Sequence, residues 1–195
     1  NFIDKNAMSW TDQIEFAIET TSLTEIYEKI SKIKYNIKGV KEKRFFLDKV
    51  RKLVKNSNNI DPNLYAEELC NELNINIDFN KMNNPLDKKI SWNQINELKD
   101  SKLISFGGHT HTHNIMSHLS NNQLNYEIDT SLELLNVKGG IRTKHYSYPE
   151  GLRHCYSEKV MQALYKRNIR CCPTAIYGVN DQFTSPFELK RIIVG

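Results

Sequence analysis

The fold is decided by one stretch of the chain, SWNQINELKDSKLISFGGHTHTHNIMSHLSNNQLNYEIDTSLELL (residues 91–135), in which helix, strand and loop patterns follow one another. Ser91 and Ser120 each stand three residues before a glutamine, which is the capping-box signature of a helix start. Between these two helices, LISF at residues 103–106 predicts a short apolar strand that ends in two glycines. The stretch therefore predicts the order helix, strand, loop, helix.

The rest of the C-terminal half repeats that order. HYSYP at residues 145–149 and IRCC at residues 169–172 are strand-like, and residues 157–168 between them have a helical pattern. Helices that alternate with short buried strands indicate a parallel α/β arrangement, whose chemistry lies in the loops that follow the strands. The histidine-rich loop and the turn at residues 148–151 both follow such strands, so we expect them to be neighbours in space.

Apolar residues recur at helical spacing from about residue 4 to residue 76, and we expect an all-helical layer of short amphipathic segments there. Asp61-Pro62 is typical of a helix start. The expected helix faces consist of Trp10, Ile14, Ala17 and Ile18; of Ile26, Ile30 and Ile33; and of Phe46, Val50, Leu53 and Val54. The polar, asparagine-rich stretch at residues 74–85 is interpreted as a connecting loop.

Composition narrows the class of protein. The 195 residues are 39% hydrophobic, which is enough for one substantial core. The net charge of +4 comes from 27 basic and 23 acidic residues in mixed-sign runs such as residues 41–44, which argues against a nucleic-acid partner. No apolar run reaches the length of a membrane span. The four cysteines lack metal or disulfide spacing, and we interpret them as reduced thiols, which indicates a cytoplasmic location.

The histidine-rich loop begins with His109, His111 and His113. If this segment is extended, all three imidazoles lie on one side, and a three-histidine zinc site is possible. If it turns into a helix, His109 and His113 share a face while His111 points elsewhere. A third alternative is a polar loop that binds nothing. The density of histidines favours a divalent metal, because two imidazoles leave room for a carboxylate and a water.

Together with its flanking helices, HTHTH at residues 109–113 resembles the second motif, H-[ST]-x-x-H, of the polysaccharide deacetylase family (the NodB homology domain, carbohydrate esterase family 4). YSYPEG at residues 146–151 resembles the family's third motif. The resemblance covers residues 88–195 and implies a distorted (β/α) barrel of the deacetylase type. Residues 5–85 would be a helical insertion within a single, incomplete domain at residues 1–195.

The resemblance implies a role for each residue that matches a motif. His109 and His113 would bind the metal, with zinc as the first choice and cobalt or nickel as alternatives. His111 falls on a variable position of the motif and would line the substrate groove.

The third motif would form the acetyl pocket. Tyr148 and Pro149 would shape one wall, and the backbone N–H of Glu150 would donate to the developing oxyanion.

Two family motifs have no counterpart in the sequence. Thr-Phe-Asp-Asp, the first motif, supplies the catalytic base and a metal-binding aspartate, and Leu-x-His, the last motif, supplies the general acid. We therefore expect the chain to be an internal piece of a longer protein and to be inactive alone. Arg191 could brace the missing aspartate through two parallel hydrogen bonds, or it could be a surface arginine on an edge strand.

The resemblance implies removal of an acetyl group, N-acetyl before O-acetyl, from a bacterial-type polysaccharide or glycan precursor. The missing motifs leave a second hypothesis open, that of an inactive glycan-binding or scaffold protein with the same fold. The sequence does not indicate an oligomeric state.

Overall fold

The computed structural model describes residues 3, 7–77, 89–192 and 194. Apart from the first three residues, the chain divides into two compact units, residues 4–89 and residues 90–195. Each unit has its own hydrophobic core, so each is described by itself.

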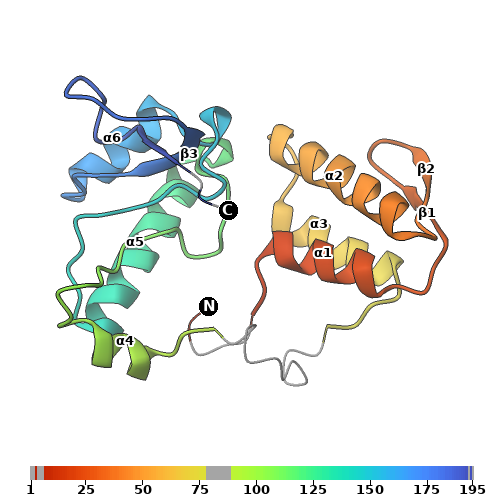
Figure 1. Cartoon of the computed structure of the whole chain (residues 1–195), viewed down its shortest axis with the longest axis horizontal. Helices are drawn as coiled ribbons and strands as arrows, with labels where there is room; N and C mark the ends of the chain where they lie inside the picture. The colour runs from red at the N-terminus through yellow and green to blue at the C-terminus, as the bar shows by residue number, and fades with distance from the viewer. Residues whose placement is uncertain (1–2, 4–6, 78–88, 193, 195) are drawn as a thin grey trace. The chain divides into compact units, whose positions relative to one another are not determined.

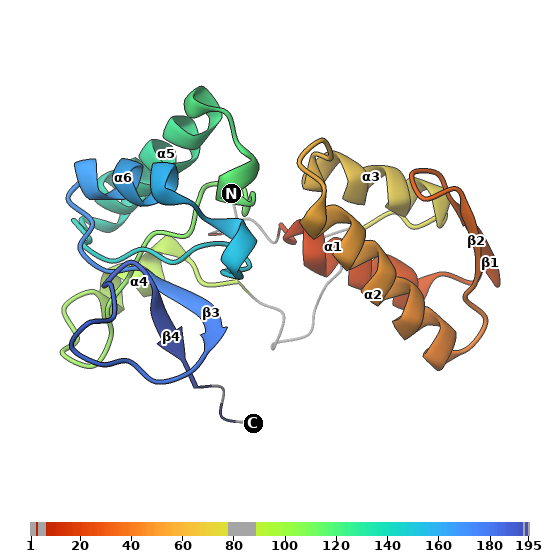
Figure 2. The same cartoon turned by 90° about the horizontal axis from the view of Figure 1, so that it is seen from above.

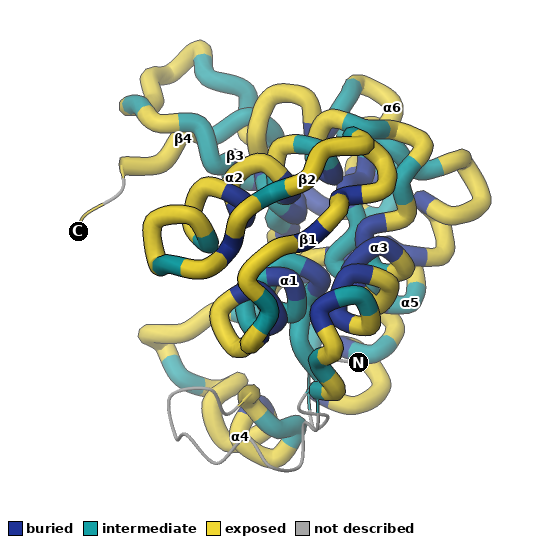
Figure 3. The backbone as a smooth tube through the Cα atoms, turned by 90° about the vertical axis from the view of Figure 1, so that its right-hand side faces the viewer, coloured by how far each residue is buried: buried dark blue, intermediate teal, exposed yellow. Residues whose placement is uncertain are grey.

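In its described residues, 7–77 and 89, the unit at residues 4–89 contains three helices and a hairpin (Figure 1). The helices are α1 (Trp10–Thr20), α2 (Val40–Asn56) and α3 (Pro62–Glu72). As expected, α3 begins at Pro62, and the side chain of Asp61 caps it by accepting two backbone N–H groups. Helix α1 packs against both α2 and α3, which buries its apolar face. The face predicted for α1 is buried, and the face predicted for α2 is buried at Phe46, Val50 and Val54, whereas Leu53 is only partly buried (Figure 3).

The expectation of an all-helical layer is wrong for residues 25–36. They form an antiparallel hairpin of β1 (Glu25–Glu28) and β2 (Ile33–Asn36), in which Ile26 lies opposite Tyr35. The helical spacing of Ile26, Ile30 and Ile33 is a coincidence, because Ile26 is buried whereas the other two are about half exposed. A helix would have placed all three on one buried face.

The unit at residues 90–195 confirms the helices predicted from the sequence. They are α4 (Trp92–Leu98), α5 (Asn121–Gly139) and α6 (Glu158–Lys166), with short 3-10 turns η3 (Met116–His118) and η4 (Arg153–Cys155). Both capping boxes are present, at Ser91 and at Ser120. Helix α5 is followed by Gly140, which caps its end in the left-handed conformation (φ of 66°) that suits glycine. Helices α5 and α6 lie side by side (Figure 2).

Parallel pairing connects the strand-like segments of this unit in chain order. Gly108 pairs with Tyr146, His145 pairs with Cys171, and β3 (Pro173–Tyr177) pairs with β4 (Leu189–Arg191), all in parallel. The expected strand at residues 103–106 is wrong, because Leu103 is 95% exposed and pairing begins only at the glycines. In the part of the chain that the structure describes, the strands do not close into a barrel.

All four cysteines are free thiols, as predicted. No helix within the described residues is long and apolar enough to cross a membrane.

Candidate metal and acetyl-binding site

The histidine loop, residues 109–113, follows directly on the first parallel pairing of the unit. Its backbone is neither extended nor helical, because Thr110 and His113 both adopt left-handed conformations, with φ of 60° and 61°. The two geometries considered from the sequence are therefore both wrong in detail. The two left-handed residues nevertheless turn the loop so that the rings of His109 and His113 lie together, with centroids 4.9 Å apart.

His111 points to a different neighbour. Its ring packs against that of Tyr126 on α5 in a T-shaped arrangement, with centroids 5.9 Å apart and planes at 89°. The structure thus brings His109 and His113 together and places His111 against a helix.

The tautomer of His109 follows from a single contact. Its Nδ1 lies 2.8 Å from the carbonyl oxygen of Ser147, and because a carbonyl can only accept, Nδ1 must donate. In the neutral ring, the lone pair then lies on Nε2, which is the usual arrangement of a metal-binding histidine whose other nitrogen is held by the protein.

The charge state of His109 also favours metal binding. The residue is partly exposed, but the surrounding protein removes much of the hydration of its ring, and this desolvation lowers the pKa of His109. The Ser147 carbonyl and Glu150 act in the opposite direction, and Arg191 adds to the lowering. Glu150 and Arg191 therefore lie close enough to His109 to act on its charge, and a neutral imidazole is the form that binds a metal.

The residues of the third motif form a sharp turn. Glu150 and Gly151 both have left-handed φ of 61°, and the carbonyl of Gly151 accepts the N–H of Ala175 on β3 at 2.8 Å. A Cβ on Gly151 would lie 2.7 Å from that nitrogen, so the turn requires glycine there. Pro149 is buried in the turn.

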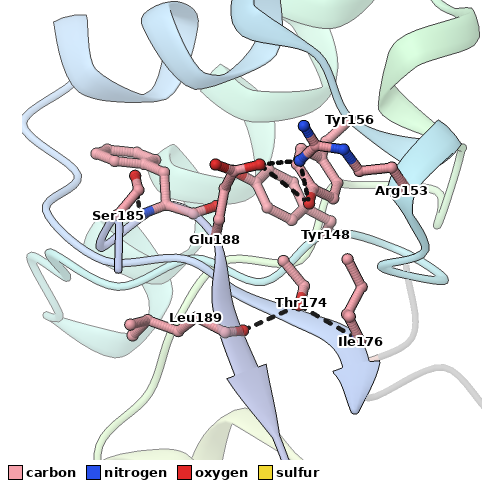
Figure 4. Close-up of polar contacts among 9 residues, drawn as sticks. Tyr148, Arg153, Tyr156, Thr174, Ile176, Ser185, Glu188 and Leu189 are labelled. Atoms are coloured by element: carbon pink, nitrogen blue, oxygen red, sulfur yellow. Dashed lines mark hydrogen bonds and ion pairs between the residues drawn. The ribbon is translucent and has the colours of Figure 1, made fainter. Parts of the chain in front are cut away.

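Tyr148, the first residue of this turn, anchors it in the core of the unit. It is 2% exposed, its ring stacks on Tyr156 at 4.5 Å, and its hydroxyl donates to the Phe187 carbonyl at 2.9 Å (Figure 4). Arg153 donates to the Tyr156 hydroxyl and pairs with Glu188. Burial raises the pKa of Tyr148, so its hydroxyl stays protonated and remains a donor.

Two buried polar residues that sequence reasoning missed hold the histidine loop. Glu127 accepts hydrogen bonds from residues 111 and 112, and the Tyr146 hydroxyl accepts the Thr110 N–H at 2.7 Å. The signal for Glu127 was its position on the mainly apolar face of α5, between Leu124 and Ile128. The signal for Tyr146 was the alternation of HYSYP, which turns both tyrosines inward.

The donor set suits a divalent cation but is incomplete. Two imidazoles, one of them with a fixed tautomer, are typical zinc ligands. Within the described residues, no group of three or more His, Cys, Asp and Glu side chains converges to hold a metal ion.

Comparison with known proteins identifies the family. A family model for polysaccharide deacetylases matches residues 54–171, which is more than half of the chain. The chain belongs to the polysaccharide deacetylase family. The resemblance noted from the sequence is thereby confirmed, although the match to the deacetylase family begins upstream of residue 88 and ends before residue 195.

Two solved structures are similar to this deacetylase-family chain. The Streptococcus pyogenes deacetylase PplD in complex with acetate is 23% identical, with a TM-score of 0.49, over 53% of this chain and 44% of PplD. The BpsB deacetylase domain from Bordetella bronchiseptica is 17% identical, with a TM-score of 0.47, over 57% of this chain and 51% of BpsB. The matched region thus spans about half the length of each structure. A search of curated proteins found no match.

Proposed function

We propose that the chain is the metal-binding part of a deacetylase that removes N-acetyl groups from a bacterial-type polysaccharide or glycan precursor. The observation that carries the proposal is the pair of adjacent imidazoles, His109 and His113, together with the Nδ1 of His109 held by Ser147. Family membership supports a hydrolase that acts on an amide or ester bond.

His109 and His113 would hold a divalent cation, with zinc as the first choice and cobalt or nickel as alternatives. When bound, such an ion supplies Lewis acidity and lowers the pKa of water. The Ser147 carbonyl would orient His109, because its hydrogen bond fixes both the tautomer and the plane of the ring.

The turn at residues 148–151 would receive the acetyl group. Its left-handed Glu150 is positioned near His109, and its backbone N–H would donate to the oxygen on which negative charge develops. Arg191 at the end of β4, whose charge also reaches His109, would brace an acidic partner of the metal site. Tyr148 and Pro149 would support this wall from the core, with His111 at the edge of the groove.

A second candidate is a glycan-binding protein of the same family without activity. It is favoured by one observation, namely that no third metal-binding side chain joins the two histidines within the described residues. Such a protein would bind the glycan and release no acetate.

The test is acetate release by the full-length, zinc-loaded protein from an N-acetylglucosamine oligomer and from an O-acetylated glycan. His109→Ala and His113→Ala should each lower the rate by roughly 100-fold or more, because Lewis-acid stabilisation is worth several kcal/mol. His111→Ala, the matched control in the same loop, should stay near normal. A dominant effect of His111, or acetate release that needs none of the three, would contradict the assignment.

A further inference from the structure

The clearest feature of the site beyond its expected ligands is the surroundings of Glu127 on α5. This side chain is 4% exposed. Its Oε2 accepts the backbone N–H groups of His111 and Thr112 at 2.7 and 2.8 Å, and its Oε1 accepts the Thr112 hydroxyl at 2.5 Å. Within the described residues, no lysine or arginine forms an ion pair with Glu127. A buried carboxylate is therefore stabilised by the loop itself.

The loop needs such support because of its backbone. Thr110 and His113 occupy the left-handed region, which is unfavourable for any residue with a Cβ and most unfavourable for a β-branched one. The N–H groups of three consecutive residues, 110 to 112, are all taken by buried side chains: the first by Tyr146, the other two by Glu127. The conformation that brings the two imidazoles together is thus held from the core.

We propose that Glu127 is a positioning residue of the metal site, which holds the histidine loop in the conformation that binds a divalent cation. This inference rests on the proposed function. Without the Glu127 carboxylate, the loop would have to be ordered when the cation binds, and the affinity for the cation would fall.

A positioning role can be separated from direct binding to the cation by the chemistry of glutamine. In Glu127→Gln the amide oxygen can accept both backbone N–H groups, while the amide NH₂ donates to the Thr112 hydroxyl, which then accepts. The loop geometry is kept and the charge is lost. Glu127→Ala removes all three hydrogen bonds. A carboxylate that bound the cation itself would be lost equally in both variants.

The experiment measures zinc affinity of the full-length protein by competition with a chromophoric chelator. Glu127→Ala should weaken binding by roughly 10-fold to 100-fold, the usual effect of removing a residue that orients metal ligands. Glu127→Gln should stay within about threefold of the unmodified protein on the same argument. Glu133→Gln, at an exposed position of the same helix, is the matched control and should bind as the unmodified protein does.

A second measurement needs no metal. Amide hydrogen exchange at residues 111 and 112 should become faster in Glu127→Ala and remain slow in Glu127→Gln. If Glu127→Ala does not fold, Thr112→Val removes one of the three hydrogen bonds and should give a smaller change in the same direction.

The outcomes are distinguishable. Zinc affinity unchanged in Glu127→Ala overturns the inference, and so does a loss in Glu127→Gln as large as that in Glu127→Ala. Failure of the unmodified protein to bind zinc refutes the proposed function instead, and the exchange rates then decide by themselves whether Glu127 holds the loop.

Discussion

Glu28 and Glu127 lie in different units, and each is a buried carboxylate that accepts two neighbouring backbone N–H groups of a turn. Glu28, 3% exposed, accepts those of its own hairpin turn at 3.0 and 2.5 Å. Glu127, 4% exposed, accepts those of His111 and Thr112 at 2.7 and 2.8 Å. Both side chains hold a turn from the inside.

The two residues differ in which turn they hold. Glu28 accepts backbone N–H groups two and three positions away, in its own hairpin, and its one printed distant bond is from the Tyr65 hydroxyl on α3. Glu127 accepts backbone N–H groups 15 and 16 positions away, in a loop outside its own helix. The local contact shapes a hairpin that carries none of the predicted site residues. The distant contact ties the histidine loop to α5, so the geometry of the candidate site depends on how that helix packs.

The largest expected effect tests the packing beneath the histidine loop. A Cβ on Gly108 would lie 2.3 Å from Cε2 of the buried Tyr146 ring, so Gly108→Ala should destabilise its unit by about 3 kcal/mol through overpacking. The measurement is the urea dependence of unfolding. Gly39→Ala in the other unit is the control, because its Cβ would meet only the carboxylate end of the exposed Glu42 side chain, and it should cost less than about 1 kcal/mol. Equal losses of stability in Gly108→Ala and Gly39→Ala would mean that the backbone at Gly108 is no more tightly packed than that at Gly39.

A smaller effect is expected when the local carboxylate is removed. Glu28→Ala leaves two turn N–H groups and the buried Tyr65 hydroxyl without their acceptor, which should lower the free energy of unfolding by about 2 kcal/mol. Zinc affinity should not change, in contrast to Glu127→Ala. The matched control is Glu25→Ala, which loses only an exposed ion pair with Lys34. If Glu28→Ala lost as much zinc affinity as Glu127→Ala, the two glutamates would not differ in their effect on the metal site.

The lowered pKa of Glu28 predicts that the stability of its unit depends on pH. Burial raises the pKa of Glu28, but the hydrogen bonds from Ser31, Ile30 and Tyr65 outweigh it, and the pKa is lowered overall from its ordinary value of 4.5. The contribution of a lowered pKa to stability is present above the unfolded-state value and is lost as the pH falls through the folded-state value. Urea midpoints of the unmodified protein and of Glu28→Gln should therefore differ most at pH 7 and converge in acid.

The smallest effect is expected at the second residue that holds the histidine loop. Tyr146→Phe removes the hydroxyl that accepts the Thr110 N–H and contacts Ser131 Oγ at 3.0 Å, and should cost about 1 kcal/mol. Its effect on zinc affinity should be smaller than that of Glu127→Ala, since one loop hydrogen bond is lost in place of three. Tyr126→Phe, at an exposed tyrosine of α5, should leave stability unchanged. A larger loss of zinc affinity in Tyr146→Phe than in Glu127→Ala would reverse the order of the two residues.

The sequence predicted those features whose causes are local. Helices α1 to α6 follow from apolar spacing and from caps such as Ser91, Ser120 and Asp61, because a helix satisfies its hydrogen bonds within the segment itself. The hairpin was missed because three isoleucines matched a helical period by chance, while the turn depends on a buried Glu28 that no period indicates.

By itself, the sequence determined the family and the helices α1 to α6, and the family resemblance selected His109 and His113, whose rings the structure places 4.9 Å apart. Only the tertiary structure decided how that pair is brought together, by left-handed turns held by Glu127 and Tyr146. The physical reason is that such a loop has no repeating pattern, and its hydrogen-bond acceptors come from segments distant in the chain. Their presence becomes visible only when α5 and the parallel segments are packed around the loop.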